Sequence, residues 1–243
     1  MAIEHSVVAL VFAAIFLFGG ALHVIKSQRA ALSFSAGVST AYVFVHMLPE
    51  MAEAGRVFVD ETSGRALPLP ELRIYTSALA GFIVFYGLNT LSGWSREQAA
   101  EGGGEPAGPS RAFALQVIGF ALYVWLVTYL MVRGIEETAV PTALYAVAMG
   151  VHFLGIDHSL FREHGNAYKR WGRFVLAAAA LAGPLSATWL VIPEPILITG
   201  LGLVSGGVVM NSMIMELPSE KDGRFWPFLG GAVAYTTLLA LIR

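Results

Sequence analysis

Ser35-Ala-Gly-Val-Ser-Thr-Ala-Tyr-Val-Phe-Val-His-Met-Leu-Pro-Glu50 is an apolar stretch that ends in two ionisable side chains. A second stretch, Ser205-Gly-Gly-Val-Val-Met-Asn-Ser-Met-Ile-Met-Glu-Leu-Pro218, repeats its outline. The Gly-Val pair and the first ionisable residue recur at the same offset, because 207 − 37 and 216 − 46 both equal 170. An ionisable group in lipid costs roughly 2.5–3.5 kcal/mol. Two such segments at matching places predict a doubled architecture with a polar pathway between its halves.

The composition is that of a helical membrane protein. The 243 residues are 56% hydrophobic and 13% charged, with a mean hydropathy of +0.66, whereas a soluble domain carries about 25% charged residues. The apolar residues form runs of membrane-spanning length, which favours several transmembrane helices in a lipid bilayer. The chain has no basic run that would indicate nucleic-acid binding. It also has no cysteine, which excludes disulfides and thiolate metal sites.

The apolar runs predict about eight spans in a single polytopic domain, residues 1–243. They cover approximately residues 6–25, 30–51, 72–91, 112–132, 140–160, 171–190, 195–215 and 227–242. Residues 92–111 contain a Gly- and Pro-rich run and predict a flexible cytoplasmic loop.

The distribution of Lys and Arg predicts the orientation. Most of the cationic residues follow the first, third, fifth and seventh spans: Lys26, Arg29, Arg96, Arg111, Arg162, Lys169, Arg170, Arg173, Lys221 and Arg224. Cytoplasmic loops carry such an excess. Both termini are therefore expected outside the cytoplasm, in a bacterial-type cytoplasmic membrane.

His46 and Glu50 stand four residues apart near the end of the second span. This spacing places both side chains on one face of a helix. An imidazole nitrogen and a carboxylate oxygen are ligands for divalent cations, so the pair is a candidate metal site at the outer end of the pathway. The alternative is that both side chains lie at the membrane interface, wetted by water.

The fifth and seventh spans supply the other candidate ligands. His152 is expected near mid-depth and is the central candidate, because ionisable groups inside a membrane are functional by default. The alternative is a neutral histidine bonded to a neighbouring helix. Asp157 and His158 are expected near the cytoplasmic end of the fifth span. They are either metal ligands or polar residues of a helix end at the membrane interface. Asn211 offers an amide oxygen to a metal or an interhelical hydrogen bond, and Glu216 is either a ligand or an interfacial charge.

The two quoted stretches resemble helices of the ZIP family of divalent-cation transporters. Ser35 to Glu50 is similar to the second helix of that family, which typically ends in His-Leu-Leu-Pro-Glu, and Ser205 to Glu220 is similar to the seventh. The resemblance implies an all-α integral membrane fold in a 3+2+3 arrangement, in which the first three and last three helices form an inverted repeat. It also implies a homodimer, and a divalent metal ion (Zn²⁺, Mn²⁺ or Fe²⁺) as substrate.

The fourth span departs from the family pattern. ZIP transporters usually carry a His-Asn-x-x-Asp/Glu-Gly motif there, whereas residues 120–133 contain no His, Asn, Asp or Glu. In the fifth span, Phe153 and Gly155 replace the acid and the proline of the family motif. The family's two-metal site cannot form from these residues. A single site built from the second, fifth and seventh spans is expected instead.

The sequence therefore predicts a divergent ZIP-like metal transporter with no enzymatic activity and no organic cofactor. His46 and Glu50 would admit the ion and His152 would bind it at the centre. Asp157, His158, Asn211 and Glu216 would form the inner exit. Two alternatives stay open. One is a transport-dead relative that serves as a membrane scaffold or regulator, which the empty fourth span favours, and the other is an intramembrane metal-dependent lipid hydrolase.

Overall fold

The computed structural model describes residues 3–19, 28–49, 51–53, 70–101, 111–133, 142–211 and 224–242. Within these ranges every regular element is a helix, so the all-α prediction is confirmed. The elements are α1 (Ile3–Phe18), α2 (Gln28–Ala41), η2 (Tyr42–Met47), α4 (Pro70–Glu101), α5 (Arg111–Arg133), α6 (Thr142–Ala167), η3 (Tyr168–Gly172), α7 (Arg173–Ala187), α8 (Glu194–Met210) and α9 (Phe225–Ile242).

Each predicted span overlaps a helix of the structure, but the helices differ in length and apolarity. Among the described residues, Leu72–Trp94 and Arg111–Arg133 are the two segments long and apolar enough to cross a membrane. Glu4–Phe18, Pro195–Met210 and Phe225–Leu241 are apolar but shorter. Two such helices are weak support for membrane association, since buried core helices can have the same length and composition. The eight-span arrangement therefore stays a prediction.

Helix α4 is longer than its predicted span. It continues to Glu101, well into the segment 92–111 that the sequence predicts as a flexible loop. The added turns contain Arg, Glu, Gln and Ala, which are good helix formers. A run of three glycines follows Glu101, and glycine is disfavoured in a helix interior.

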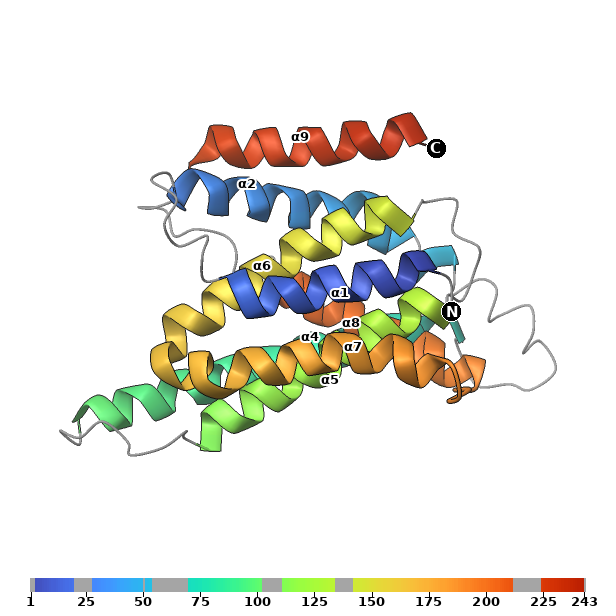
Figure 1. The fold of residues 1–243 in the computed structure, drawn as a ribbon. Helices are drawn as coiled ribbons and strands as arrows, with labels where there is room; N and C mark the ends of the chain where they lie inside the picture. The colour runs from blue at the N-terminus through green and yellow to red at the C-terminus, as the bar shows by residue number, and fades with distance from the viewer. Residues whose placement is uncertain are drawn as a thin grey trace.

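The helices pack in pairs that join the first part of the chain to the last. Helix α2 lies along α9, and α4 lies along α8. Helix α5 packs on α7, and α6 contacts both α1 and α2. In Figure 1, α9 and α2 form the upper layer, while α4, α5, α7 and α8 gather on the other side of α1 and α6.

The α2–α9 pair is held in close contact by two reciprocal glycines. A Cβ atom on Gly37 would overlap the carbonyl oxygen of Phe228, and a Cβ atom on Gly231 would overlap that of Phe34. Phe228 lies three residues before Gly231 in α9, and Phe34 lies three residues before Gly37 in α2. Only glycine lets the two backbones approach this closely, as in small-residue contacts between membrane helices.

The α4–α8 pair repeats the same contact. A Cβ atom on Gly206 would overlap the carbonyl oxygen of Ala78, and a Cβ atom on Gly81 would overlap that of Leu203. Ala78 and Leu203 again precede the partner glycine by three residues. Gly206 in α8 is therefore the structural equivalent of Gly37 in α2, at an offset of 206 − 37 = 169.

A change of helical geometry marks the same equivalence. The π-helical turn η2 begins at Tyr42, and Asn211, the residue after α8, also has π-helical geometry; 211 − 42 is again 169. The Leu-Pro pairs that end in Pro49 and Pro218 share this offset in the sequence. The offset of 170 predicted from the Gly-Val pair and the ionisable residues is thus one residue too long for the backbone repeat.

The two ends of the bundle carry different charges. The start of α1 and the end of α9 lie at one end of the bundle (Figure 1). At the opposite end lie the start of α5, the start of α9 and the corner formed by α6, η3 and α7. We call this the cationic end. It carries Arg111, Arg162, Lys169, Arg170, Arg173 and Arg224. Arg73 and Arg133 are the described arginines of the opposite end.

Candidate functional site

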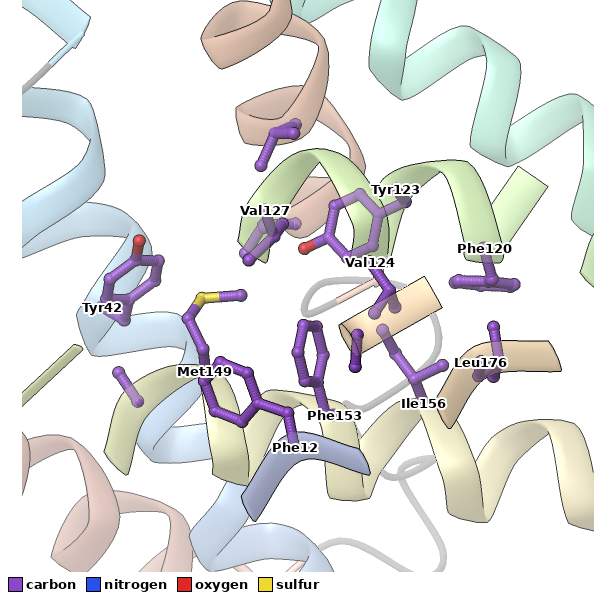
Figure 2. Packing of buried hydrophobic residues seen from close by; sticks show 14 of the residues in the cluster. Phe12, Tyr42, Phe120, Tyr123, Val124, Val127, Met149, Phe153, Ile156 and Leu176 are labelled. Atoms are coloured by element: carbon purple, nitrogen blue, oxygen red, sulfur yellow. The ribbon is translucent and has the colours of Figure 1, made fainter. Parts of the chain in front are cut away.

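His152 lies in the middle of α6 and is almost completely buried, at 1% exposure. Its Nε2 is 3.0 Å from the phenolic oxygen of Tyr123 in α5. Which of the two atoms donates depends on the imidazole tautomer. The next residue, Phe153, packs edge-on against Phe12 of α1 with ring centroids 4.9 Å apart. Figure 2 shows Phe12 of α1, Tyr123 of α5 and Phe153 of α6 gathered in the interior of the bundle.

The pair formed by His152 and Tyr123 has neighbours from α2 and α8. The hydroxyl of Ser35 in α2 donates a hydrogen bond to the carbonyl oxygen of Val151, at 3.3 Å. On the other side, Gly207 of α8 packs against the ring of Tyr123. The second, fourth, fifth and seventh predicted spans therefore meet around this buried pair.

The π-helical turn η2 brings a second histidine into the interior. His46 is buried, at 4% exposure, and its ring centroid lies 5.3 Å from that of Tyr42. Tyr42 also makes an edge contact with Tyr235 of α9, at 6.1 Å. The amide of Leu48 donates to the carbonyl of Val43, which is the wide i→i−5 bond of a π turn. Such turns are frequent at functional sites.

Asn211 occupies the equivalent place at the end of α8, and α8 packs against η2. Its side chain is 1% exposed, and neither amide atom forms a hydrogen bond with any residue that the structure describes. Within the same limits, the buried hydroxyls of Ser205 in α8 and Ser39 in α2 also make no hydrogen bond. A buried polar group left unsatisfied costs about 1–3 kcal/mol. These neutral oxygen atoms thus have capacity for a ligand or water.

Asp157 lies apart from His152, although both belong to α6. The carboxylate is 2% exposed and accepts a hydrogen bond of 2.5 Å from the phenol of Tyr168 in η3. Its other oxygen packs against Gly19, where a Cβ atom would overlap it. Burial raises the pKa of Tyr168 above its ordinary value, so the phenol keeps its proton and remains the donor. Asp157 therefore ties α6 to the corner that leads into α7.

The predicted metal ligands are only partly gathered. Within the described ranges, no three His, Asp or Glu side chains come close enough to hold a metal ion together. His158 is half-buried, while His46 and His152 are buried. The predicted ligands Glu50 and Glu216 lie outside the described residues.

The sequence interpretation missed Tyr123, because a search for metal ligands passes over phenols. Tyr123 and Gln116 are the polar residues on one face of α5, seven residues apart, and both are buried. That spacing of polar side chains in an apolar helix was available in the sequence. It would have indicated a polar contact between the fourth and fifth spans.

A second polar cluster lies at the cationic end, where α4, α5 and α6 meet. We call Ser92, Gln116, Glu163 and His164 the inner cluster. The amide of Gln116 donates to Glu163 at 3.1 Å, and its Oε1 lies 2.6 Å from Nε2 of His164. The hydroxyl of Ser92 is 3.3 Å from the same nitrogen. His164 lies beyond the predicted fifth span, 140–160, but within α6, because α6 continues to Ala167.

Comparison with known proteins adds no family. The chain matches no family model and no curated protein.

Proposed function

We propose that this chain is a divergent ZIP-like transporter of divalent metal ions, with eight spans in a 3+2+3 arrangement in a cytoplasmic membrane. The observation that carries the proposal is the equivalence of the α2–α9 and α4–α8 pairs around buried His152. The two pairs use the same reciprocal glycine contact. Tyr42 and Asn211, at the same place in the two repeated helices, both have π-helical geometry. Inverted repeats with irregular helices at the midplane are the usual construction of a transporter binding site.

The surface supports a membrane location. Large apolar side chains are exposed on the outer helices, including Leu79 and Ile83 of α4, Leu122 of α5 and Val233 of α9. A soluble monomer rarely exposes such extended apolar surface. Exposed tryptophans are found in α4, in η3 and at the start of α9: Trp94, Trp171 and Trp226. Tryptophan is enriched at membrane interfaces, and cytoplasmic loops carry excess cations, so the cationic end fits the cytoplasmic side.

The interior supports a single central site for the transported ion. His152 would be the nitrogen ligand, and Asn211 would supply a neutral oxygen from the equivalent of the η2 turn. His46 lies one turn after Tyr42 and would bind the ion on its way to or from the centre. Imidazole and oxygen ligands suit Zn²⁺, Mn²⁺ and Fe²⁺. Tyr123 would hold the ring of His152 in place, as partners of ligating histidines do.

Metal binding by the purified protein tests the proposal. We expect Zn²⁺ or Mn²⁺ to raise the thermal stability of the wild type, and His152→Gln to lose one equivalent of bound metal. His5→Gln, at the far end of α1, is the matched control and should bind as the wild type does. Size-exclusion chromatography would show that the variants remain folded. Equal stoichiometry in the wild type and His152→Gln would exclude His152 as a ligand.

A second candidate is a transport-dead membrane scaffold of the same fold. It is favoured by the apolar α5 and by the lack, among the described residues, of three His, Asp or Glu side chains at one point. A scaffold would bind no metal at His152 and would not depend on that residue for function.

A further inference from the structure

We propose that the inner cluster is a second divalent-cation site, separate from His152. It lies at the cationic end and takes its side chains from three helices: Ser92 from α4, Gln116 from α5, and Glu163 and His164 from α6. It does not rest on transport, because a scaffold of the same fold could bind a metal ion here.

The cluster brings three side-chain oxygen atoms close to one imidazole nitrogen. Nε2 of His164 lies 2.6 Å from Oε1 of Gln116, 3.3 Å from Oγ of Ser92 and 3.8 Å from Oε2 of Glu163. A tetrahedral ion with bonds of about 2.0–2.2 Å sets its ligands about 3.4 Å apart. The observed separations lie on both sides of that value. Each of the three distances from Nε2 thus lies within about 1 Å of the spacing between two ligands of one ion.

The chemistry of the four side chains fits a first-row divalent ion. Glu163 supplies a carboxylate, His164 an imidazole, and Gln116 and Ser92 neutral oxygens. This mixed nitrogen and oxygen set suits Zn²⁺ or Mn²⁺ and lacks the soft sulfur ligands that select Cu⁺.

The surroundings would strengthen binding by excluding water. The side chains of His164 and Glu163 are 7% and 12% exposed, and Gln116 and Ser92 are buried. The ring of Phe113 covers the imidazole, with centroids 4.8 Å apart. Electrostatic contacts are stronger in such a low-dielectric site than in water.

The position gives the site a consequence for the fold. The next residue, Gly165, has a φ of 49°, the one described positive-φ glycine, and the chain turns there from α6 into η3. A bound ion would cross-link α4, α5 and α6 directly before this turn. Metal occupancy would then stiffen the corner between α6 and α7.

Co²⁺ titration of the detergent-solubilised protein tests this site. We expect this site to contribute one equivalent of Co²⁺ and a visible d–d absorption band in addition to those of the His152 site, and Glu163→Gln and His164→Gln each to lose that contribution. His5→Gln is the control and should keep the band. Gln116→Glu adds a second carboxylate, so it should raise Co²⁺ affinity by about tenfold or more if the cluster holds a metal.

The outcomes separate this site from the central one. His152→Gln should leave the absorption band of the inner cluster unchanged. Glu163→Gln should leave one equivalent of metal bound at His152. Unchanged Co²⁺ binding in Glu163→Gln and His164→Gln would overturn the proposal. If those variants fail to fold, Gln116→Glu decides: a lower or unchanged affinity would show that the cluster is only a hydrogen-bonded contact between helices.

Discussion

The phenol of Tyr123 lies 3.0 Å from Nε2 of His152, with both side chains buried between α5 and α6. This contact gives the apolar fourth span a polar role that its composition hides. Tyr123 is in turn covered by Phe85 of α4, with ring centroids 5.3 Å apart, and by Gly207 of α8. The orientation of His152 thus depends on helices from both halves of the chain.

Removing the Tyr123 hydroxyl should impair the centre of the molecule. Tyr123→Phe leaves the ring packed but takes away the partner of the imidazole nitrogen, which costs about 1–3 kcal/mol. We expect a lower stability to denaturant and weaker metal binding at His152. Tyr145→Phe, which removes a hydroxyl that donates to the carbonyl of Val127, is the control and should retain metal binding.

The reciprocal glycine contacts predict opposite effects at two neighbouring positions. Gly231→Ala would push a Cβ atom into the backbone of α2, whereas Gly230→Ala would meet nothing within 4 Å. Overpacking costs about 1–3 kcal/mol, which lowers Tm by about 2–4 °C per kcal/mol. Gly230→Ala should leave Tm unchanged or raise it, because alanine favours a helix.

The repeat predicts that Gly206→Ala has the same effect as Gly231→Ala. Its Cβ atom would overlap the backbone of α4 in the equivalent contact. Thermal melts of the three alanine variants check the pattern. If Gly206→Ala and Gly231→Ala have the same Tm as Gly230→Ala, then the close backbone contacts are not present in the folded protein.

The bond between Tyr168 and Asp157 should appear as a coupling energy. Tyr168→Phe and Asp157→Ala each remove the contact that joins η3 to α6, so the double variant should lose less stability than the sum of the singles. A coupling of about 1–3 kcal/mol is expected for this short buried hydrogen bond. Additive losses in a denaturant-based double-mutant cycle would show that the two side chains do not interact.

The charge asymmetry predicts which end faces the cytoplasm. The chain has no cysteine, so Arg170→Cys and Trp189→Cys report on the two ends without background. In intact cells a membrane-impermeant maleimide should label Trp189→Cys, and Arg170→Cys only after permeabilisation. The reverse pattern would invert the topology, and labelling of both in intact cells would contradict a membrane-spanning bundle.

The sequence predicts the helices well because apolar runs fix where helices form. The repeat is also visible in the sequence, but one residue out of register. Pairing Gly37 with Gly207 and His46 with Glu216 gives an offset of 170, whereas the backbone contacts of Gly37 and Gly206 give 169. Gly206 and Gly207 are adjacent in the sequence, and only the packed structure shows which of them meets a neighbouring backbone.

The polar contacts between helices could not be predicted to the same degree. Which side chain meets His152 or His164 depends on the helix face that packs against α6, and the sequence does not fix this choice. The burial of Tyr123 and Gln116 follows from the pairing of α5 with α6 and α4. The end of α4 at Glu101 was also missed, because the composition of the whole loop obscured its helix-forming first part.

Metal uptake into proteoliposomes tests the central claim most directly. Vesicles containing the wild-type protein and a fluorescent chelator should accumulate Zn²⁺ or Mn²⁺ faster than protein-free vesicles. His152→Gln should lower the rate by about tenfold or more, in line with the loss of a ligand, and His5→Gln should not. Wild-type uptake no faster than that of empty vesicles, or equal uptake by His152→Gln, would contradict transport through the His152 centre.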